Sequence, residues 1–273
     1  MNPPAKLVAF LGLLVGVFGL SYVAGGQSQA LLAPVQIHNS EMLPPASTAD
    51  GYALSAVEPT QKPGKDVPVE FNLTAPGGQV LSGLDEDSGE HLHLIAFRRD
   101  LTGYQHLIAQ QGEQTSWWAL LNLKPGPWHV ITYFQSPALG REITLTTDFM
   151  VSGGYHPTPL PPPANQAQAK GVTVTLAGDL STRADSSTAA TVTDRGQPVI
   201  DLQPAHGALA HGVVIRPADL SYLHLHSNSQ GSGPQLDFFG RLPDKGSYRM
   251  FVEFFRVSSD TPYVAAFTVQ AAR

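Results

Sequence analysis

Short runs of apolar and β-branched residues, separated by clusters of Gly, Pro, Asn and Asp, recur along most of the chain. Seven runs lie between residues 52 and 151: YALSAV, VPVEFNL, HLHLIAF, YQHLIA, WWALLNL, WHVITYF and ITLTTDFMV. Seven more lie between residues 172 and 269: VTVTLA, AATVT, GVVI, YLHLH, QLDFFG, YRMFVEF and VAAFTV. Runs of this length and spacing are typical of β-strands, and no window beyond the N-terminal segment has the 3.6-residue period of a helix. The pattern therefore predicts an all-β fold.

The two sets of runs are copies of one unit. GQVLSGL at 78–84 matches GQPVIDL at 196–202, an offset of 118, and the same offset relates His93 to His211 and His106 to His224. The repeats run over residues 50–152 and 171–273, each near the ~100 residues of an immunoglobulin-like sandwich. We therefore predict two tandem immunoglobulin-like antiparallel β-sandwiches, with the aromatic residues of 128–134 and 248–255 in their cores. Between them, residues 153–170 contain LPPPANQ and predict an extended, fairly stiff linker.

An uncharged apolar segment precedes the repeats. Residues 7–24 would form a helix about 27 Å long, which nearly matches the hydrocarbon core of a membrane. Lys6 precedes this segment and the next basic residue is Lys62, a bias that places the N-terminus in the cytoplasm. We expect residues 1–29 to be a cytoplasmic stub with one transmembrane signal-anchor helix, residues 30–49 a linker, and both sandwiches to lie outside the cytoplasm.

Cleavage of this segment is the alternative. Ser28 and Ala30 could be the small residues of a signal-peptidase site, and the protein would then be secreted. The apolar run is longer than the ~7–15 residues usual for a signal peptide, which favours an uncleaved anchor. In both interpretations the two sandwiches lie outside the cytoplasm.

Composition excludes several classes of function. The 273 residues include 16 basic and 22 acidic side chains, a formal net charge of -6, so we expect no nucleic acid partner. No cysteine is present, which excludes disulfides, thiolate zinc sites, iron–sulfur clusters and blue copper. The chain also lacks a GxSxG elbow, a Walker loop, an HExxH motif and a dinucleotide fingerprint, and we expect it not to be an enzyme.

Histidines follow the repeat. In each copy two histidines are thirteen residues apart, His93 and His106 in the first and His211 and His224 in the second, with a turn between them at 98–103 or 216–221. Each segment should form a β-hairpin, whose arms lie side by side. Residues two apart on a strand share a face, so an HLH triplet and a histidine from the opposite arm could place three imidazoles around one ion. The candidate metal ligands are His211, His224, His226, His91, His93 and His106.

Imidazole suits Cu(II) and Zn(II), and copper should bind most tightly in the divalent series. The four methionines form no cluster, so the thioether ligands that select Cu(I) are missing. In the first repeat the acidic residues of 85–90 could add carboxylate ligands or orient an imidazole. Histidines that only form hydrogen bonds within the fold are the alternative interpretation.

Two segments carry a family resemblance. HLIAFRRDLTGYQHLI at 93–108 and DLQPAHGALAHGVVIRPADLSYLHLHS at 201–227 resemble the repeated signature of bacterial membrane-anchored or secreted proteins of the heavy-metal-binding-domain type. In that family a histidine precedes a DL turn, and a histidine–x–histidine–proline ends each repeat. The resemblance spans residues 50–273 and implies a role in copper or other metal handling. Ile108 replaces the last histidine of the first repeat, and Ala109 and Ser227 replace the prolines, so the second repeat is the better site.

Together these features predict an exported, membrane-anchored protein that binds Cu(II) or Zn(II) and acts in metal handling at the cell envelope. Its partners would be the membrane, the metal ion and another envelope protein. The alternative function is a non-catalytic scaffold or adhesive module outside the cytoplasm, in which the histidines are structural. Imidazoles gathered in one space would favour the metal, and rings on opposite faces of a sheet would favour the scaffold.

Overall fold

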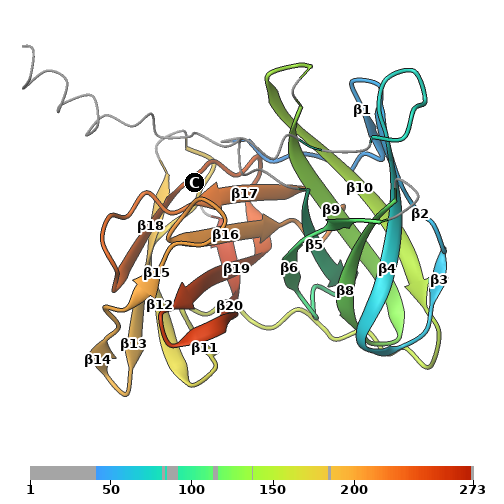
Figure 1. Cartoon of the computed structure of the whole chain (residues 1–273). Coiled ribbons are helices and arrows are strands. Elements are labelled where there is room, and N and C mark those ends of the chain that lie inside the picture. Colours follow the sequence, from blue (N-terminus) through green and yellow to red (C-terminus); the bar gives the residue numbers. More distant parts are fainter. Residues whose placement is uncertain are drawn as a thin grey trace, which may run out of the picture. The chain divides into compact units, whose positions relative to one another are not determined.

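The computed structural model describes residues 41–81, 84, 92–112, 116–136, 138–183 and 186–271. Every helix or strand assigned within these ranges is a β-strand, as Figure 1 shows, so the predicted all-β fold is confirmed. Among the same residues, no helix has the length and apolar character needed to cross a membrane. The predicted anchor at 7–24, His91 and the acidic residues of 85–90 lie outside the described residues.

The first half of the chain forms two facing sheets. Its strands are β1 (Thr48–Ala49), β2 (Tyr52–Ala56), β3 (Thr60–Gln61), β4 (Gly64–Thr74), β5 (His93–Arg98), β6 (Gln105–Ile108), β7 (Gln110–Gln111), β8 (Trp117–Leu123), β9 (Gly126–Ser136) and β10 (Arg141–Val151). One sheet has the order β1-β2-β4-β8-β7 and the other β3-β10-β9-β5-β6. Leu73 and Leu121 of the first sheet share a buried core with Leu94 and Val130 of the second.

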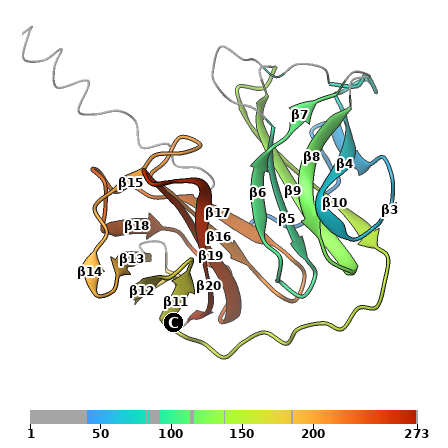
Figure 2. The ribbon, with the colours of Figure 1, turned by 60° about the horizontal axis from the view of Figure 1, so that its bottom comes forward.

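The second half repeats this arrangement. Its strands are β11 (Gln166–Ala169), β12 (Val172–Asp179), β13 (Ser187–Asp194), β14 (Gln197–Pro198), β15 (Leu202–Gln203), β16 (Ala210–Ile215), β17 (Tyr222–His226), β18 (Gln235–Phe239), β19 (Gly246–Arg256) and β20 (Ser259–Ala271). One sheet has the order β11-β12-β13-β14, with β18 also paired to β13, and the other has β15-β19-β16-β17, with β20 paired to β19 (Figure 2). Strand β11 begins inside the segment predicted as linker.

Strand order identifies both halves as sandwiches of the immunoglobulin type. The sheets β2-β4-β8 and β12-β13-β18 correspond, as do β10-β9-β5-β6 and β20-β19-β16-β17. In each half the first, second and fifth of these strands form one sheet and the others form the second, as strands A, B, E and C, F, G do in immunoglobulin domains. The predicted tandem β-sandwiches are therefore confirmed, and each of the fourteen predicted runs overlaps a strand.

A third apolar cluster joins the two sandwiches. It contains buried residues of both halves: Ile95, Phe97, Leu101, Ile131, Tyr133, Val213, Ile215, Leu220, Tyr222 and Phe251. All six residues of β16 are buried, because the inner face of its sheet lies in the second core and the outer face in this cluster. Tyr133 and Phe251, which we predicted in the sandwich cores, belong to this interface instead.

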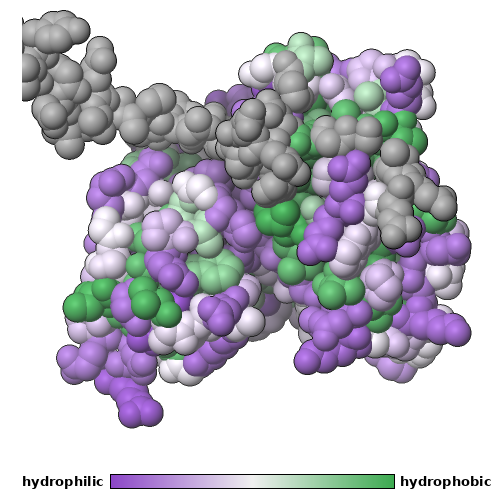
Figure 3. Space-filling model, in the orientation of Figure 1, coloured by the Kyte–Doolittle hydropathy of each residue, from purple (hydrophilic) through white to green (hydrophobic). Residues whose placement is uncertain are grey.

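The segment before β1 contacts both halves. Leu43 exchanges two backbone hydrogen bonds with Tyr222 of β17, at 2.8 and 2.9 Å, and the Thr146 amide of β10 donates to the Ala46 carbonyl. Hydrophilic side chains cover much of the visible surface in Figure 3, as expected when most large apolar residues are in the three clusters. The sheets that carry β5, β6, β16 and β17 therefore place the candidate histidines close to a buried interface.

Candidate metal centre

The register of the second hairpin brings its three histidines together. Strands β16 and β17 pair antiparallel, with His211 opposite His226 and Val213 opposite His224. Because opposite residues and residues two apart share a face, all three imidazoles lie on one side of the sheet. One ligand atom from each lies within 4.8 Å of the others, and the ring centroids are 4.7 to 5.3 Å apart. The predicted hairpin and the predicted convergence of His211, His224 and His226 are confirmed.

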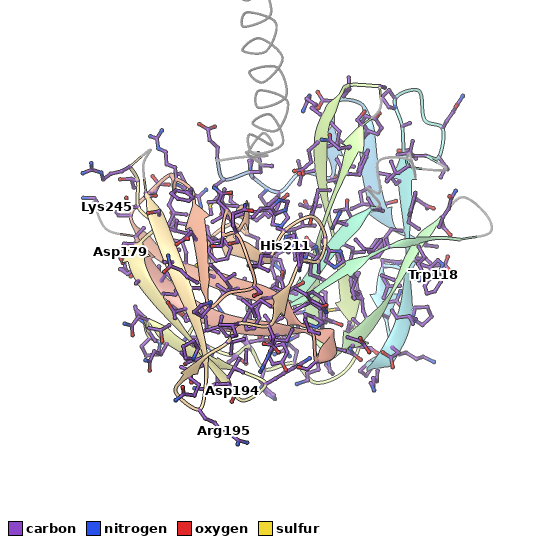
Figure 4. All side chains as sticks on the ribbon, turned by 60° about the vertical axis from the view of Figure 1, so that its left-hand side comes forward. Trp118, Asp179, Asp194, Arg195, His211 and Lys245 are labelled. Carbon is purple, nitrogen blue, oxygen red and sulfur yellow. The ribbon has the colours of Figure 1, made fainter. Side chains whose placement is uncertain are left out.

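Hydrogen bonds determine which nitrogen of His211 can bind an ion. Its Nε2 lies 2.9 Å from the carbonyl oxygen of Ala205, which can only accept, so Nε2 carries the proton. The Nδ1 lone pair faces Nε2 of His224 at 3.1 Å. Metal-binding histidines commonly donate their other ring N–H to a backbone carbonyl in this way. In Figure 4, His211 lies among other side chains in the interior, whereas Asp194, the last residue of β13, and Arg195 lie at the periphery.

The first hairpin has the same arrangement with one histidine fewer. In the pairing of β5 and β6, His93 lies opposite Ile108 and Ile95 opposite His106. The Nδ1 of His93 is 3.4 Å from Nε2 of His106, which matches the His211–His224 contact in atoms and in register. Ile108 occupies the place of His226, so this hairpin supplies a pair of imidazoles among the described residues.

The two hairpins contribute to one cluster. The His106 ring centroid is 5.3 Å from that of His211 and 5.2 Å from that of His206. Its Nδ1 lies 3.3 Å from Oε1 of Glu253, on β19 of the second sandwich. We expected separate sites within separate hairpins, but the burial of the outer sheet faces against each other brings the imidazoles of both repeats together.

Burial controls the charge of the cluster. His106 is 4% exposed and His211 1% exposed. Desolvation, followed by the neighbouring His206, lowers the pKa of His106 to about 3, and desolvation, followed by His106, lowers the pKa of His211 to about 4. These imidazoles are therefore neutral at pH 7, the form that binds metal ions.

Glu253 is the one carboxylic acid in the cluster among the described residues. It is fully buried, at 0% exposure, and desolvation raises its pKa to about 7, although the imidazoles of His211 and His206 partly oppose this shift. The sequence analysis missed this residue. The signal was available, because Glu253 is the only charged residue of the run MFVEFF at 250–255. A carboxyl group in such a run has to be paired, protonated or bound to a cation.

Two other neighbours of the cluster were also missed. Tyr133 was assigned to a core, but its hydroxyl lies 3.1 Å from Nε2 of His106, and its ring stacks on His93 at 4.4 Å. His206 lies in a tight turn with a φ of 51°, and its ring centroid is 5.6 Å from that of His93. His129, by contrast, is hydrogen-bonded to Asp148 at 2.7 Å, and among the described residues its ring is paired with no other imidazole.

The donor spacings suit one small ion. Zn(II) binds imidazole nitrogen at about 2.0–2.1 Å, so two ligands at angles of 90–110° lie about 2.9–3.4 Å apart. The distance of 3.1 Å between Nδ1 of His211 and Nε2 of His224 falls in this range. One ligand atom from each of His211, His224 and His226 lies within 4.8 Å of the other two. A donor set of imidazole nitrogens fits Cu(II) or Zn(II).

Comparison with known proteins adds a family model for part of the chain. A model described as a domain of unknown function, DUF8832, matches residues 167–273, which is less than half of the chain and coincides with the second sandwich. No curated protein is significantly similar to the chain.

Solved structures give distant likenesses. The Escherichia coli adhesin FdeC has 16% identity and a TM-score of 0.25, with 83% of this chain and 65% of that chain covered. A β-glucuronidase of Parabacteroides merdae has 9% identity and a TM-score of 0.24, with 82% and 24% covered. Fibronectin(III)-like modules of Clostridium thermocellum CbhA have 11% identity and a TM-score of 0.21, with 81% and 95% covered. The chain thus spans under two thirds of the adhesin and about a quarter of the glucuronidase. Scores this low carry no argument about function.

Proposed function

We propose that this protein is a non-catalytic metal-binding module that acts outside the cytoplasm, held at the membrane by residues 7–24, and that His211, His224 and His226 bind Cu(II) or Zn(II). The observation that carries the proposal is the convergence of three imidazoles within 4.8 Å on one face of a hairpin. The Ala205 carbonyl, which leaves Nδ1 of His211 as an acceptor, supports it further. The role of the protein would be metal handling at the cell envelope.

Ligand chemistry favours oxidised copper or zinc over Cu(I). The chain contains no cysteine, and its four methionines are far apart in sequence, so the cluster is built from nitrogen and oxygen donors. A neutral imidazole has one ring nitrogen without a proton, and this nitrogen can bind an ion directly. In His224 that nitrogen must be Nε2 when the ion binds. For a nitrogen site of this kind Cu(II) should bind more tightly than Zn(II).

Titration of the purified full-length protein with Cu(II) and with Zn(II) tests this proposal. We expect the variant His224→Ala/His226→Ala to lose the ion bound by the second hairpin, measured as stoichiometry and affinity by calorimetry. His156→Ala is the matched control, because His156 is exposed and lies in the linker segment. Circular dichroism checks that each variant folds. Unchanged stoichiometry and affinity in the double variant would reject the site.

A scaffold or adhesive module with structural histidines, contacting an envelope protein, is the second candidate. The specific observation in its favour is that both ring nitrogens of His211 have protein partners, at 2.9 and 3.1 Å, so this side chain is satisfied without an ion. This function predicts that neither Cu(II) nor Zn(II) binds stoichiometrically. It also predicts that alanine variants of the cluster lose stability, since the hydrogen bonds join the strands.

A further inference from the structure

The first hairpin pairs its two imidazoles with a phenol. Nε2 of His106 lies 3.4 Å from Nδ1 of His93 and 3.1 Å from the hydroxyl oxygen of Tyr133. Both distances fall within the range of about 2.9–3.4 Å expected for neighbouring ligands of one Cu(II) or Zn(II) ion. Tyr133 comes from β9, next to β5, and lies directly opposite His93. The three donors therefore come from three adjacent strands, with Nε2 of His106 within 3.4 Å of each of the other two.

The remaining nitrogen of His106 faces a carboxyl group of the other sandwich. Its Nδ1 is 3.3 Å from Oε1 of Glu253, and both side chains are at most 1% exposed. The two atoms lie close together, but their geometry does not form a hydrogen bond, so the carboxyl group lies beside the ring without fixing which ring nitrogen carries the proton.

We infer that His93, His106 and the Tyr133 phenolate form a second Cu(II) site, which lies beside the buried Glu253 of the second sandwich. This inference rests on the proposed function and extends it from one ion to two. Binding requires the phenol to lose its proton to solvent, and the metal does not change its oxidation state. Tyr133 supplies the third ligand that Ile108 cannot supply.

Copper titration of the full-length protein distinguishes the two sites. We expect two Cu(II) ions per chain and a visible charge-transfer band from the phenolate–copper bond. Tyr133→Phe should abolish the band and lower the affinity for one of the two Cu(II) ions by about 10-fold or more, while the other ion stays bound. Tyr222→Phe is the control, because Tyr222 is buried in the same interface but bonded to Thr144 at 3.0 Å. A band that survives in Tyr133→Phe would overturn the inference.

The reciprocal variant separates this inference from the proposed function. In His224→Ala/His226→Ala the band and one bound ion should remain, because both belong to the first hairpin. If wild type binds a single ion that this double variant loses, the proposed function stands and the second site is wrong. If the double variant has the same single ion and band as wild type, the second-hairpin site is wrong and the Tyr133 site stands.

Discussion

Tyr133 and Glu253 occupy equivalent places in the two sandwiches. Tyr133 lies opposite His93 in the pairing of β9 with β5, and Glu253 lies opposite His211 in the pairing of β19 with β16. The phenol contacts His106 at its Nε2 and the carboxyl group faces the same ring at its Nδ1. One imidazole therefore connects the polar groups of both repeats, and changes on either side should affect the whole cluster.

Acid should destabilise the protein through the buried histidines. The pKa of His106 is lowered to about 3 and that of His211 to about 4, from an ordinary value of 6.5. A group with a lowered folded-state pKa binds fewer protons when folded, so its contribution to stability is complete above pH 6.5 and is lost as pH falls toward 4. We expect the free energy of unfolding to fall by a few kcal/mol over this interval, measured by urea unfolding. His156→Ala should leave the profile unchanged.

Glu253 should have the opposite pH dependence. Its pKa is raised to about 7 from 4.5, so its contribution to stability is complete below pH 4.5 and is lost as pH rises through 7. Glu253→Gln should therefore gain stability relative to wild type between pH 4.5 and pH 8, by on the order of 3 kcal/mol. Guanidinium unfolding across this range measures the difference. The exposed Glu58→Gln is the control, and a difference independent of pH would contradict the prediction.

Phe251 should hold the two sandwiches together. It is 2% exposed, lies in the apolar cluster between the halves and stacks on Tyr104 at 4.4 Å. Phe251→Ala should cost about 3–5 kcal/mol and split thermal unfolding into two calorimetric transitions, one for each sandwich. Phe239→Ala, at a residue that is 54% exposed, should change stability by about 0.5 kcal/mol or less. A single transition at unchanged temperature in Phe251→Ala would argue against a coupled interface.

The two hairpin turns allow a matched comparison of buried and exposed carboxylates. Asp100 is 2% exposed at its side chain and accepts hydrogen bonds from Arg98, Thr102 and the Thr158 amide of the linker segment. Asp219, in the corresponding turn of the second repeat, is 42% exposed and pairs with Arg216.

Asp100→Ala should therefore cost about 2–3 kcal/mol and release the linker contact, because it removes the ion pair with the partly buried Arg98 and the acceptor of the Thr158 amide. Asp219→Ala should cost about 1 kcal/mol or less. Urea unfolding of the two variants measures this difference. Equal costs would show that burial does not govern the strength of these turns.

Local patterns in the sequence predicted most of the fold and the centre of the candidate site. The repeat offset, the turns at 98–103 and 216–221, and the spacing of thirteen between histidines determine the hairpins, and the period of a strand then places His211, His224 and His226 on one face. Six short or polar strands, such as β11 with the sequence QAQA, were not predicted because they carry no apolar period.

The joining of the two repeats was not predictable by the same reasoning. Alternation along a strand shows which residues share a face, but not whether the outer face meets water or another sheet. The run GVVI of β16, which does not alternate, was the available sign of burial on both faces. Glu253 lies beside His106 only because the outer faces are in contact, so its place in the candidate site required the structure, whereas Tyr133 and His106 belong to one sheet.

The short segment ahead of β1 has a mechanical consequence. Leu43 is hydrogen-bonded to β17 and Ala46 to β10, within four residues of chain. A pulling force applied at Glu41 would therefore load the second sandwich through Leu43 and the first through Ala46, before either sheet could be peeled apart alone. Tension on this end of the protein would be resisted by both domains together.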